Sequence, residues 1–298
     1  MTLPPRPETV TEVADGIRRI IAPNASPMTH WGTNTYLLGA ESVVVIDPGP
    51  EDAAHFDAIL SALGDAEVTH ILVSHAHRDH SPLAARLARR TGAPVCAFGH
   101  AAAGRSPVMA ALAESGMAGG GEGVDTGFVP DTSIGDGTVI ATGAGKIEVI
   151  HTPGHMEGHL SFALGDVLFS GDHVMGWAST LISPPDGDLG AFRASCARLL
   201  ARGDAVYLPG HGAPITETAE RVEWLLSHRD AREAAILSAL ADGAAKAGVL
   251  TRRVYTDIPE AMLPMAERNL LAHLIDLAEQ SVVLARPHVA LDAVWELA

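Results

Sequence analysis

The segment His75-Ala76-His77-Arg78-Asp79-His80 places three imidazoles and a carboxylate within six residues. It follows residues 68–74, an apolar and β-branched stretch that predicts a buried strand. It precedes residues 81–90, which predict a helix with Ser81 as N-cap and Pro82 in the first turn. We therefore expect the cluster on a loop leaving a strand, where such side chains can bind zinc, or else manganese or iron.

Three later segments repeat this arrangement of polar side chains after a short apolar strand. They are residues 151–159 with His155 and His159, residues 169–173 with Asp172 and His173, and residues 208–212 with His211. Each contains a glycine that allows a sharp turn. Four strand ends carrying His and Asp predict one metal site assembled from distant parts of the chain.

In this order, the motifs HxHxDH, TPGH, SGD and PGHG resemble the metallo-β-lactamase superfamily over residues 30–212. The resemblance implies an α/β (α+β) fold, an αββα sandwich with a two-metal site at one edge. It implies one metal held by His75, His77 and His155, a second held by Asp79, His80 and His211, and Asp172 bridging the two. Zn²⁺ is the expected ion for both positions, with Mn²⁺ or Fe²⁺ as alternatives.

This ligand set predicts hydrolysis. Two divalent ions and two carboxylates leave a net positive charge, and metal binding lowers the pKa of water to about 7, so a hydroxide is available at neutral pH. Asp79 is the expected proton acceptor. Esters, thioesters, lactones and phosphodiesters are candidate substrates, because each passes through an oxyanion that metals stabilise. His159 and His173 are expected to orient a ligand, to touch substrate or simply to pack. Seven histidines without a supporting motif are interpreted as surface or core residues: His30, His55, His70, His100, His228, His273 and His288.

Composition limits the remaining classes of protein. The 298 residues are 47% hydrophobic, enough for one large domain and a small one. No apolar run reaches the roughly 18 residues of a membrane span, and residues 1–8 show no signal region, so a cytoplasmic protein is expected. Cys96 and Cys196 lie outside the metal motifs and are expected to be buried and reduced. The net charge of −16 disfavours nonspecific binding to a phosphate backbone.

The C-terminal part has a different pattern. Residues 217–240 predict a long amphipathic helix, 251–255 the start of a second and 262–280 a third, before strands at 281–285 and 289–295. This order resembles a small winged-helix domain, and we place the catalytic domain at 1–218 and the C-terminal domain at 219–298. The second domain is expected to pack, to form a homodimer or to bind nucleic acid. Three arginines of this part are candidate phosphate contacts or solvated surface residues: Arg252, Arg253 and Arg268.

Three further segments resemble the β-lactamase-like protein 2 group, over nearly the whole chain: residues 31–37, 46–50 and 266–274. The group includes a single-strand endoribonuclease, so single-stranded RNA stands beside a small-molecule ester or thioester as a candidate substrate. A glyoxalase II-like thioesterase and a non-catalytic metal-binding protein are the alternatives. Residues 177–190 predict a rigid loop at the mouth of the site, with Trp177 against substrate or in the core.

Overall fold

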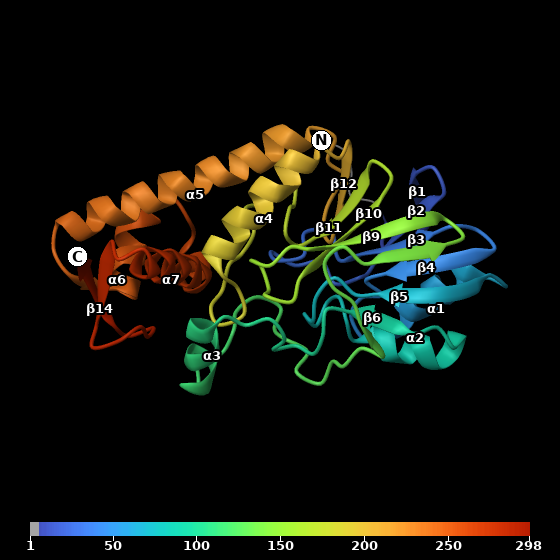
Figure 1. The fold of residues 1–298 in the computed structure, drawn as a ribbon, viewed down its shortest axis with the longest axis horizontal. Helices are drawn as coiled ribbons and strands as arrows, with labels where there is room; N and C mark the ends of the chain where they lie inside the picture. Colours follow the sequence, from blue (N-terminus) through green and yellow to red (C-terminus); the bar gives the residue numbers. More distant parts are fainter. Residues whose placement is uncertain (1–5) are drawn as a thin grey trace.

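The computed structural model describes residues 6–298, so the first five residues of the segment examined for a signal region lie outside it. Two sheets pack face to face (Figure 1). The first sheet runs in chain order: β1 Thr11–Ala14, β2 Ile17–Ile21, β3 Asn34–Leu38, β4 Ser42–Ile46, β5 Glu67–Leu72, β6 Val95–Ala97 and β7 Thr132–Ser133. The second has the order β12 Val206–Pro209, β11 Val167–Gly171, β10 Leu160–Leu164, β9 Gly145–His151 and β8 Val139–Thr142.

Alternation along the strands creates the layers. In β4, Val43 and Val45 face a core with helices α1 (Ala53–Leu63) and α2 (Leu83–Thr91), whereas Val44 and Ile46 face the second sheet. On the outer face of the second sheet lie α4 (Leu189–Arg202) and the first half of α5 (Thr218–Ala241). The four layers confirm the predicted αββα sandwich.

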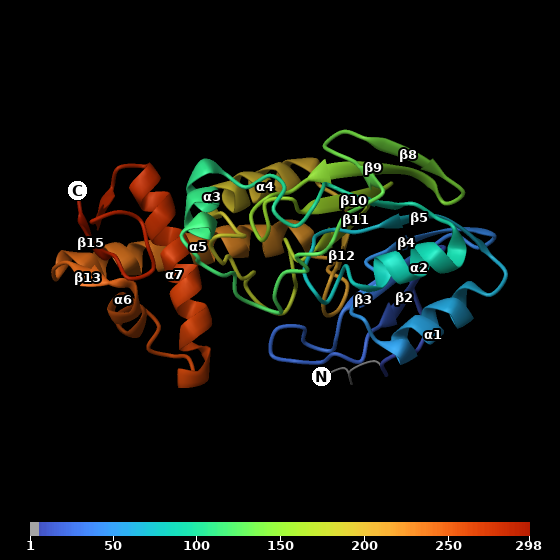
Figure 2. The same cartoon turned by 90° about the horizontal axis from the view of Figure 1, so that it is seen from below.

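A second core lies at the other end of the molecule (Figure 2). It is built by the second half of α5, α6 (Ala247–Val254), α7 (Leu263–Glu279) and a sheet with the order β13 (Ala245–Lys246), β15 (Val294–Leu297), β14 (Val283–Arg286). Helix α3 (Pro107–Glu114) adds Met109 and Leu112 to it. This is the predicted winged-helix-like part, and the division between residues 218 and 219 stays a prediction.

Helix α5 belongs to both cores. Its Val222 and Leu225 are buried against α4 and the second sheet, whereas Ile236 and Leu240 are buried among α6 and α7. Within residues 6–298, no helix is both long and apolar enough to cross a membrane. Cys96 and Cys196 are buried free thiols, as predicted.

Three predictions of element ends were wrong. Ser81 does not cap α2, because its hydroxyl oxygen lies 2.9 Å from Asp125 Oδ2 and 3.1 Å from His77 O, and the helix begins at Leu83. The second C-terminal helix begins four residues earlier than predicted, directly after Lys246 pairs with Val294 in the small sheet. The last strand begins at Val294 rather than at residue 289, because a turn closes from Ala293 N to Ala290 O.

The burial of His273 in the C-terminal part can be tested by the pH dependence of stability. Its side chain is fully buried in α7, and neither ring nitrogen has a hydrogen-bond partner. Burial, together with Arg229, lowers the pKa of His273 to about 2. Below pH 6.5 the unfolded chain therefore binds a proton that the folded chain does not, so stability falls as the pH falls from 6.5 toward 2.

Lowering the pH from 7 to 5 should reduce the free energy of unfolding by about 2 kcal/mol through this residue, because each pH unit below 6.5 contributes about 1.4 kcal/mol. Over the same pH range, the free energy of unfolding of His273→Leu should fall by about 2 kcal/mol less than that of the unmodified protein. Urea unfolding in the presence of chelator measures this. His288→Leu, at an exposed site of the same domain, is the control. The same pH dependence in the unmodified protein and His273→Leu would contradict the assignment.

Candidate metal centre

The strand-end loops meet at one edge of the sandwich. Seven buried side chains form two groups, and within each group the potential ligand atoms lie within 4.8 Å of one another. The first group is His75, His77 and His155, and the second is Asp79, His80, Asp172 and His211. These are the seven residues singled out in the sequence, so the fold brings all of them together.

The three imidazoles of the first group are packed tightly. His77 Nδ1 lies 2.9 Å from His75 Nε2 and 3.0 Å from His155 Nε2. A proton on one of these nitrogens cannot satisfy the other two, so lone pairs face one another across a small buried space. A divalent cation would satisfy all three, and the donor set therefore fits a metal such as zinc.

Asp172 stands between the two groups. Its Oδ2 lies 3.7 Å from His155 Nε2 and 3.3 Å from His211 Nε2, while Oδ1 is buried and lacks a hydrogen-bond partner. His211 Nε2 also lies 3.1 Å from Asp79 Oδ2. A buried carboxylate oxygen that has no hydrogen bond and lies 3.5 Å from His80 Nε2 fits a site that takes a second cation.

Gly210 allows this close approach. A Cβ atom at residue 210 would come within 2.3 Å of Asp172 Oδ1 and 2.7 Å of His80 Cε1. Only glycine fits here, which explains the Pro-Gly-His order before His211.

Outer partners fix the orientation of the rings. Asp47 Oδ2 lies 3.0 Å from His80 Nδ1 and accepts from the Ser74 hydroxyl, whose oxygen lies 2.9 Å from His75 Nδ1. Such contacts orient ligands and select the tautomer that faces the metal. The sequence analysis did not assign Asp47 to the site, although it follows the strand at residues 43–46 and so carries the same strand-end signal.

Burial and neighbouring charges give the candidate ligands different protonation states. Burial lowers the pKa of His77 to about 3, which keeps this imidazole neutral and able to bind a cation. Burial also disfavours the charged form of His211, but Asp172 and Asp79 raise its pKa to about 10. For Asp172, burial favours the neutral acid, yet His211 and His80 hold the pKa well below its usual value.

The two remaining motif histidines differ. The Asp172 backbone N–H donates to His159 Nε2 at 3.2 Å, and His159 Nδ1 lies 2.8 Å from Thr152 Oγ1, so His159 supports the backbone of a candidate ligand. His173 is buried with Nε2 3.6 Å from Cys196 Sγ, and its ring packs on Phe192.

A cavity of about 260 Å³ opens onto Asp172 and His155. The sandwich side contributes Met28, Met175 and Trp177, and the C-terminal side contributes Tyr255, Ile258, Met262 and Met265. The polar lining includes His228 and Arg232 of α5. Burial, with Arg229 and other arginines, lowers the pKa of His228 to about 4 and leaves it uncharged at neutral pH. The cavity is thus mainly apolar and closed by both parts of the chain. Trp177 lies at its wall, stacked on His30.

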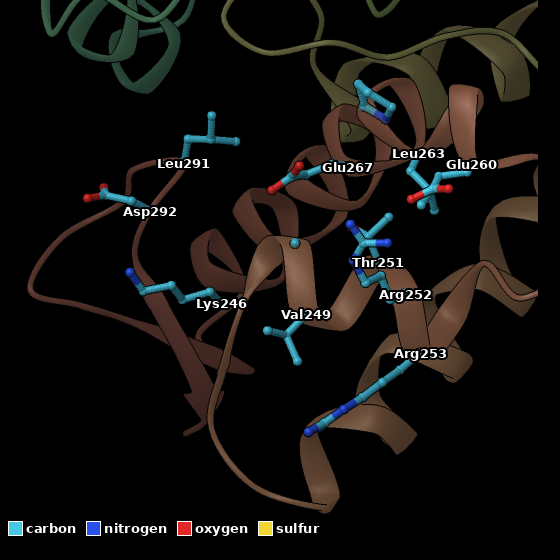
Figure 3. Close-up of a pocket in the computed structure, with 12 residues that line it drawn as sticks. Lys246, Val249, Thr251, Arg252, Arg253, Glu260, Leu263, Glu267, Leu291 and Asp292 are labelled. Atoms are coloured by element: carbon cyan, nitrogen blue, oxygen red, sulfur yellow. The ribbon is translucent and has the colours of Figure 1, made fainter.

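A second cavity lies in the C-terminal part (Figure 3). Its lining includes three basic and three acidic side chains: Lys246, Arg252, Arg253, Glu260, Glu267 and Asp292. Figure 3 shows Arg253 extending away from Glu260 and Glu267. Arg268 instead donates to the Pro184 carbonyl at 3.3 Å. The phosphate contacts expected of these arginines stay a prediction.

The sequence matches the family described as the metallo-beta-lactamase superfamily over residues 28–211, and the beta-lactamase associated winged helix domain over residues 247–287. A Drosophila melanogaster protein named beta-lactamase-like protein 2 homolog is 30% identical over 287 residues, covering 91% of this chain and 90% of that protein. An atrochrysone carboxyl ACP thioesterase of Aspergillus terreus is 27% identical over 246 residues, covering 80% of this chain and 67% of that protein.

Among solved structures, a metallo-beta-lactamase family protein from Thermus thermophilus superposes with a TM-score of 0.77 at 26% identity. The match covers 96% of this chain and 100% of the Thermus chain. The paired His and Asp groups, the four-layer sandwich and the winged-helix part thus agree with both sequence matches. The chain belongs to the metallo-beta-lactamase superfamily, as a hydrolase that resembles the beta-lactamase-like protein 2 group.

Proposed function

We propose that this protein is a two-metal hydrolase that cleaves esters or thioesters of apolar acyl groups. The observation that carries the proposal is the apolar cavity that opens onto Asp172 and His155. Methionine side chains adapt to irregular apolar ligands, and the volume and apolar lining of the cavity suit a small acyl group rather than single-stranded RNA. The fungal thioesterases among the relatives support this substrate class.

His75, His77 and His155 would hold one ion, Asp79, His80 and His211 the other, and Asp172 both. Zn²⁺ fits this nitrogen-rich donor set, and Mn²⁺ or Fe²⁺ are the alternatives. When bound, two such ions would supply a nucleophile at neutral pH and would stabilise the developing oxyanion.

The chain's own residues bind and orient the substrate and move a proton. The apolar wall binds the acyl group and excludes water, which strengthens every charge interaction at the cavity floor. Asp79 Oδ2 accepts a hydrogen bond from the Thr33 hydroxyl at 3.3 Å and lies 3.1 Å from His211 Nε2, within the second group of candidate ligands. We assign it the role of accepting the proton released when the nucleophile attacks.

The substrate class is tested by comparing two probes. Purified protein loaded with Zn²⁺ should hydrolyse hexanoyl-N-acetylcysteamine thioester, and chelator or Asp79→Ala should abolish this activity. A labelled single-stranded RNA should remain intact under the same conditions. Metal-dependent and Asp79-dependent cleavage of the RNA, without thioester hydrolysis, would contradict the proposal and favour an endoribonuclease.

Asp172→Ala should remove the second metal and reduce kcat/KM by about 100-fold or more, because Asp172 Oδ2 lies 3.7 Å from His155 Nε2 in one group and 3.3 Å from His211 Nε2 in the other. Metal content measured by mass spectrometry, with thioester hydrolysis in parallel, checks this. The control is Asp136→Ala, which removes a partly exposed carboxylate paired with Arg198 at the surface. An Asp172→Ala protein that keeps both metals would remove the bridging role from Asp172.

Met265→Gln should weaken binding of longer acyl chains, because it places an amide in the apolar wall. Burial of each methylene contributes about 0.8 kcal/mol, so the variant should lose several-fold more kcat/KM with a hexanoyl than with an acetyl thioester. Met117→Gln, outside this cavity, is the matched control. Equal loss for both chain lengths would show that residue 265 does not contact the acyl group.

A further inference from the structure

Residues 180–182 connect the candidate metal centre to the C-terminal helices. The Leu181 carbonyl accepts a hydrogen bond from His155 Nδ1 at 2.8 Å. Because a carbonyl can only accept, Nδ1 carries the proton and the lone pair of His155 lies on Nε2. That nitrogen is the one that faces His77 Nδ1 at 3.0 Å. The position of a single carbonyl therefore sets both the tautomer and the direction of His155.

Side chains from α5 and α7 anchor the chain on both sides of this carbonyl. The guanidinium of Arg229, in α5, donates to the Thr180 carbonyl. On the other side, the Ile182 backbone N–H donates to Asn269 Oδ1, in α7, at 3.0 Å. Arg229 Nη1 also donates to Asn269 Oδ1 at 3.2 Å, so the two anchors are joined.

Arg229 is suited to this role by its environment. Its side chain is fully buried, and its hydrogen bonds go to Thr180 O and Asn269 Oδ1 rather than to a carboxylate. Among residues 6–298, no ion pair of Arg229 is found, whereas Arg193 of the facing helix pairs with Asp230 and Glu233. A buried guanidinium is costly unless hydrogen bonds satisfy it, and Arg229 Nε is buried without a partner among the described residues. The bonds to Thr180 O and Asn269 Oδ1 are therefore the contacts that offset this cost and hold the backbone of residues 180–182.

We propose that Asn269 and Arg229 are positioning residues that hold His155 in its metal-binding orientation through the backbone of residues 180–182. The proposal rests on the proposed function, in which His155 is a ligand. It gives the C-terminal helices a part in metal affinity, in addition to lining the cavity.

Two substitutions of nearly the same shape separate positioning from packing. Asn269→Leu removes the acceptor that binds Ile182 N–H and Arg229, whereas Asn269→Asp keeps an oxygen acceptor at that place. Zn²⁺ affinity is measured by competition with a chromophoric chelator, without substrate, so contact of residue 269 with the cavity does not enter. His155→Ala identifies which of the two binding steps depends on His155.

Asn269→Leu should lower the Zn²⁺ affinity of the His155-dependent binding step about tenfold, which is the low end of the effect of losing a hydrogen bond around a metal ligand. Asn269→Asp should have the Zn²⁺ affinity of the unmodified protein. Thr251→Val is the matched control, because it removes a buried hydroxyl bonded to Ala247 O in the same part of the molecule without contact to residues 180–182. Its Zn²⁺ affinity should equal that of the unmodified protein.

Unchanged Zn²⁺ affinity in Asn269→Leu, or equal weakening in Asn269→Leu and Thr251→Val, would overturn the inference. Failure of Asn269→Asp to restore affinity would also overturn it, because packing rather than the acceptor would then be responsible. If the unmodified protein binds no Zn²⁺, this inference and the proposed function both fail. If it binds two ions but hydrolyses no thioester, only the proposed function fails.

Discussion

The structure depends on one constraint, which is that buried nitrogen and oxygen atoms able to bind a metal are held close together. His77 Nδ1 lies 2.9 Å from His75 Nε2 and 3.0 Å from His155 Nε2, and the Asp172 carboxylate adds negative charge beside them. Such a cluster is unfavourable in a protein interior until a cation neutralises it. The two sheets, with helices on both outer faces, supply the packing that holds it together, which explains why every candidate ligand follows or adjoins a strand of the core.

Local signals in the sequence predicted many of the strands and the loops that carry the His and Asp motifs, whereas the αββα sandwich and the division of the ligands between two metals were implied by the resemblance to the metallo-β-lactamase superfamily. The strand before His75 is rich in apolar and β-branched residues, and alternation in residues 43–46 assigns each side chain to a layer. The cavity could not be predicted in the same way. Met28, Met175 and Met265 share no periodicity, and only the packing of α7 against the sandwich brings them together. The start of α6 was missed because Lys246 gives no sequence signal for the strand pairing that precedes the helix.

The C-terminal helices are closely tied to the chemistry of the sandwich. Met265 of α7 lines the cavity, while Asn269, one turn further along, reaches the segment that contacts His155. The same helix thus borders the cavity in which we place the acyl group and contacts the segment that bonds to His155. Changes that alter the size of the cavity from this side are therefore expected to alter metal binding as well, unless the hydrogen bonds of residue 269 are kept.

Helix α5 makes the two parts of the molecule mechanically inseparable. It is 24 residues long, so at about 1.5 Å per residue it extends roughly 36 Å as one rod through both cores. Cutting the chain before this helix would strip Val222 and Leu225 from the sandwich and leave the apolar surface of α4 open to water. The winged-helix part is therefore built into the fold of the sandwich through the shared helix α5.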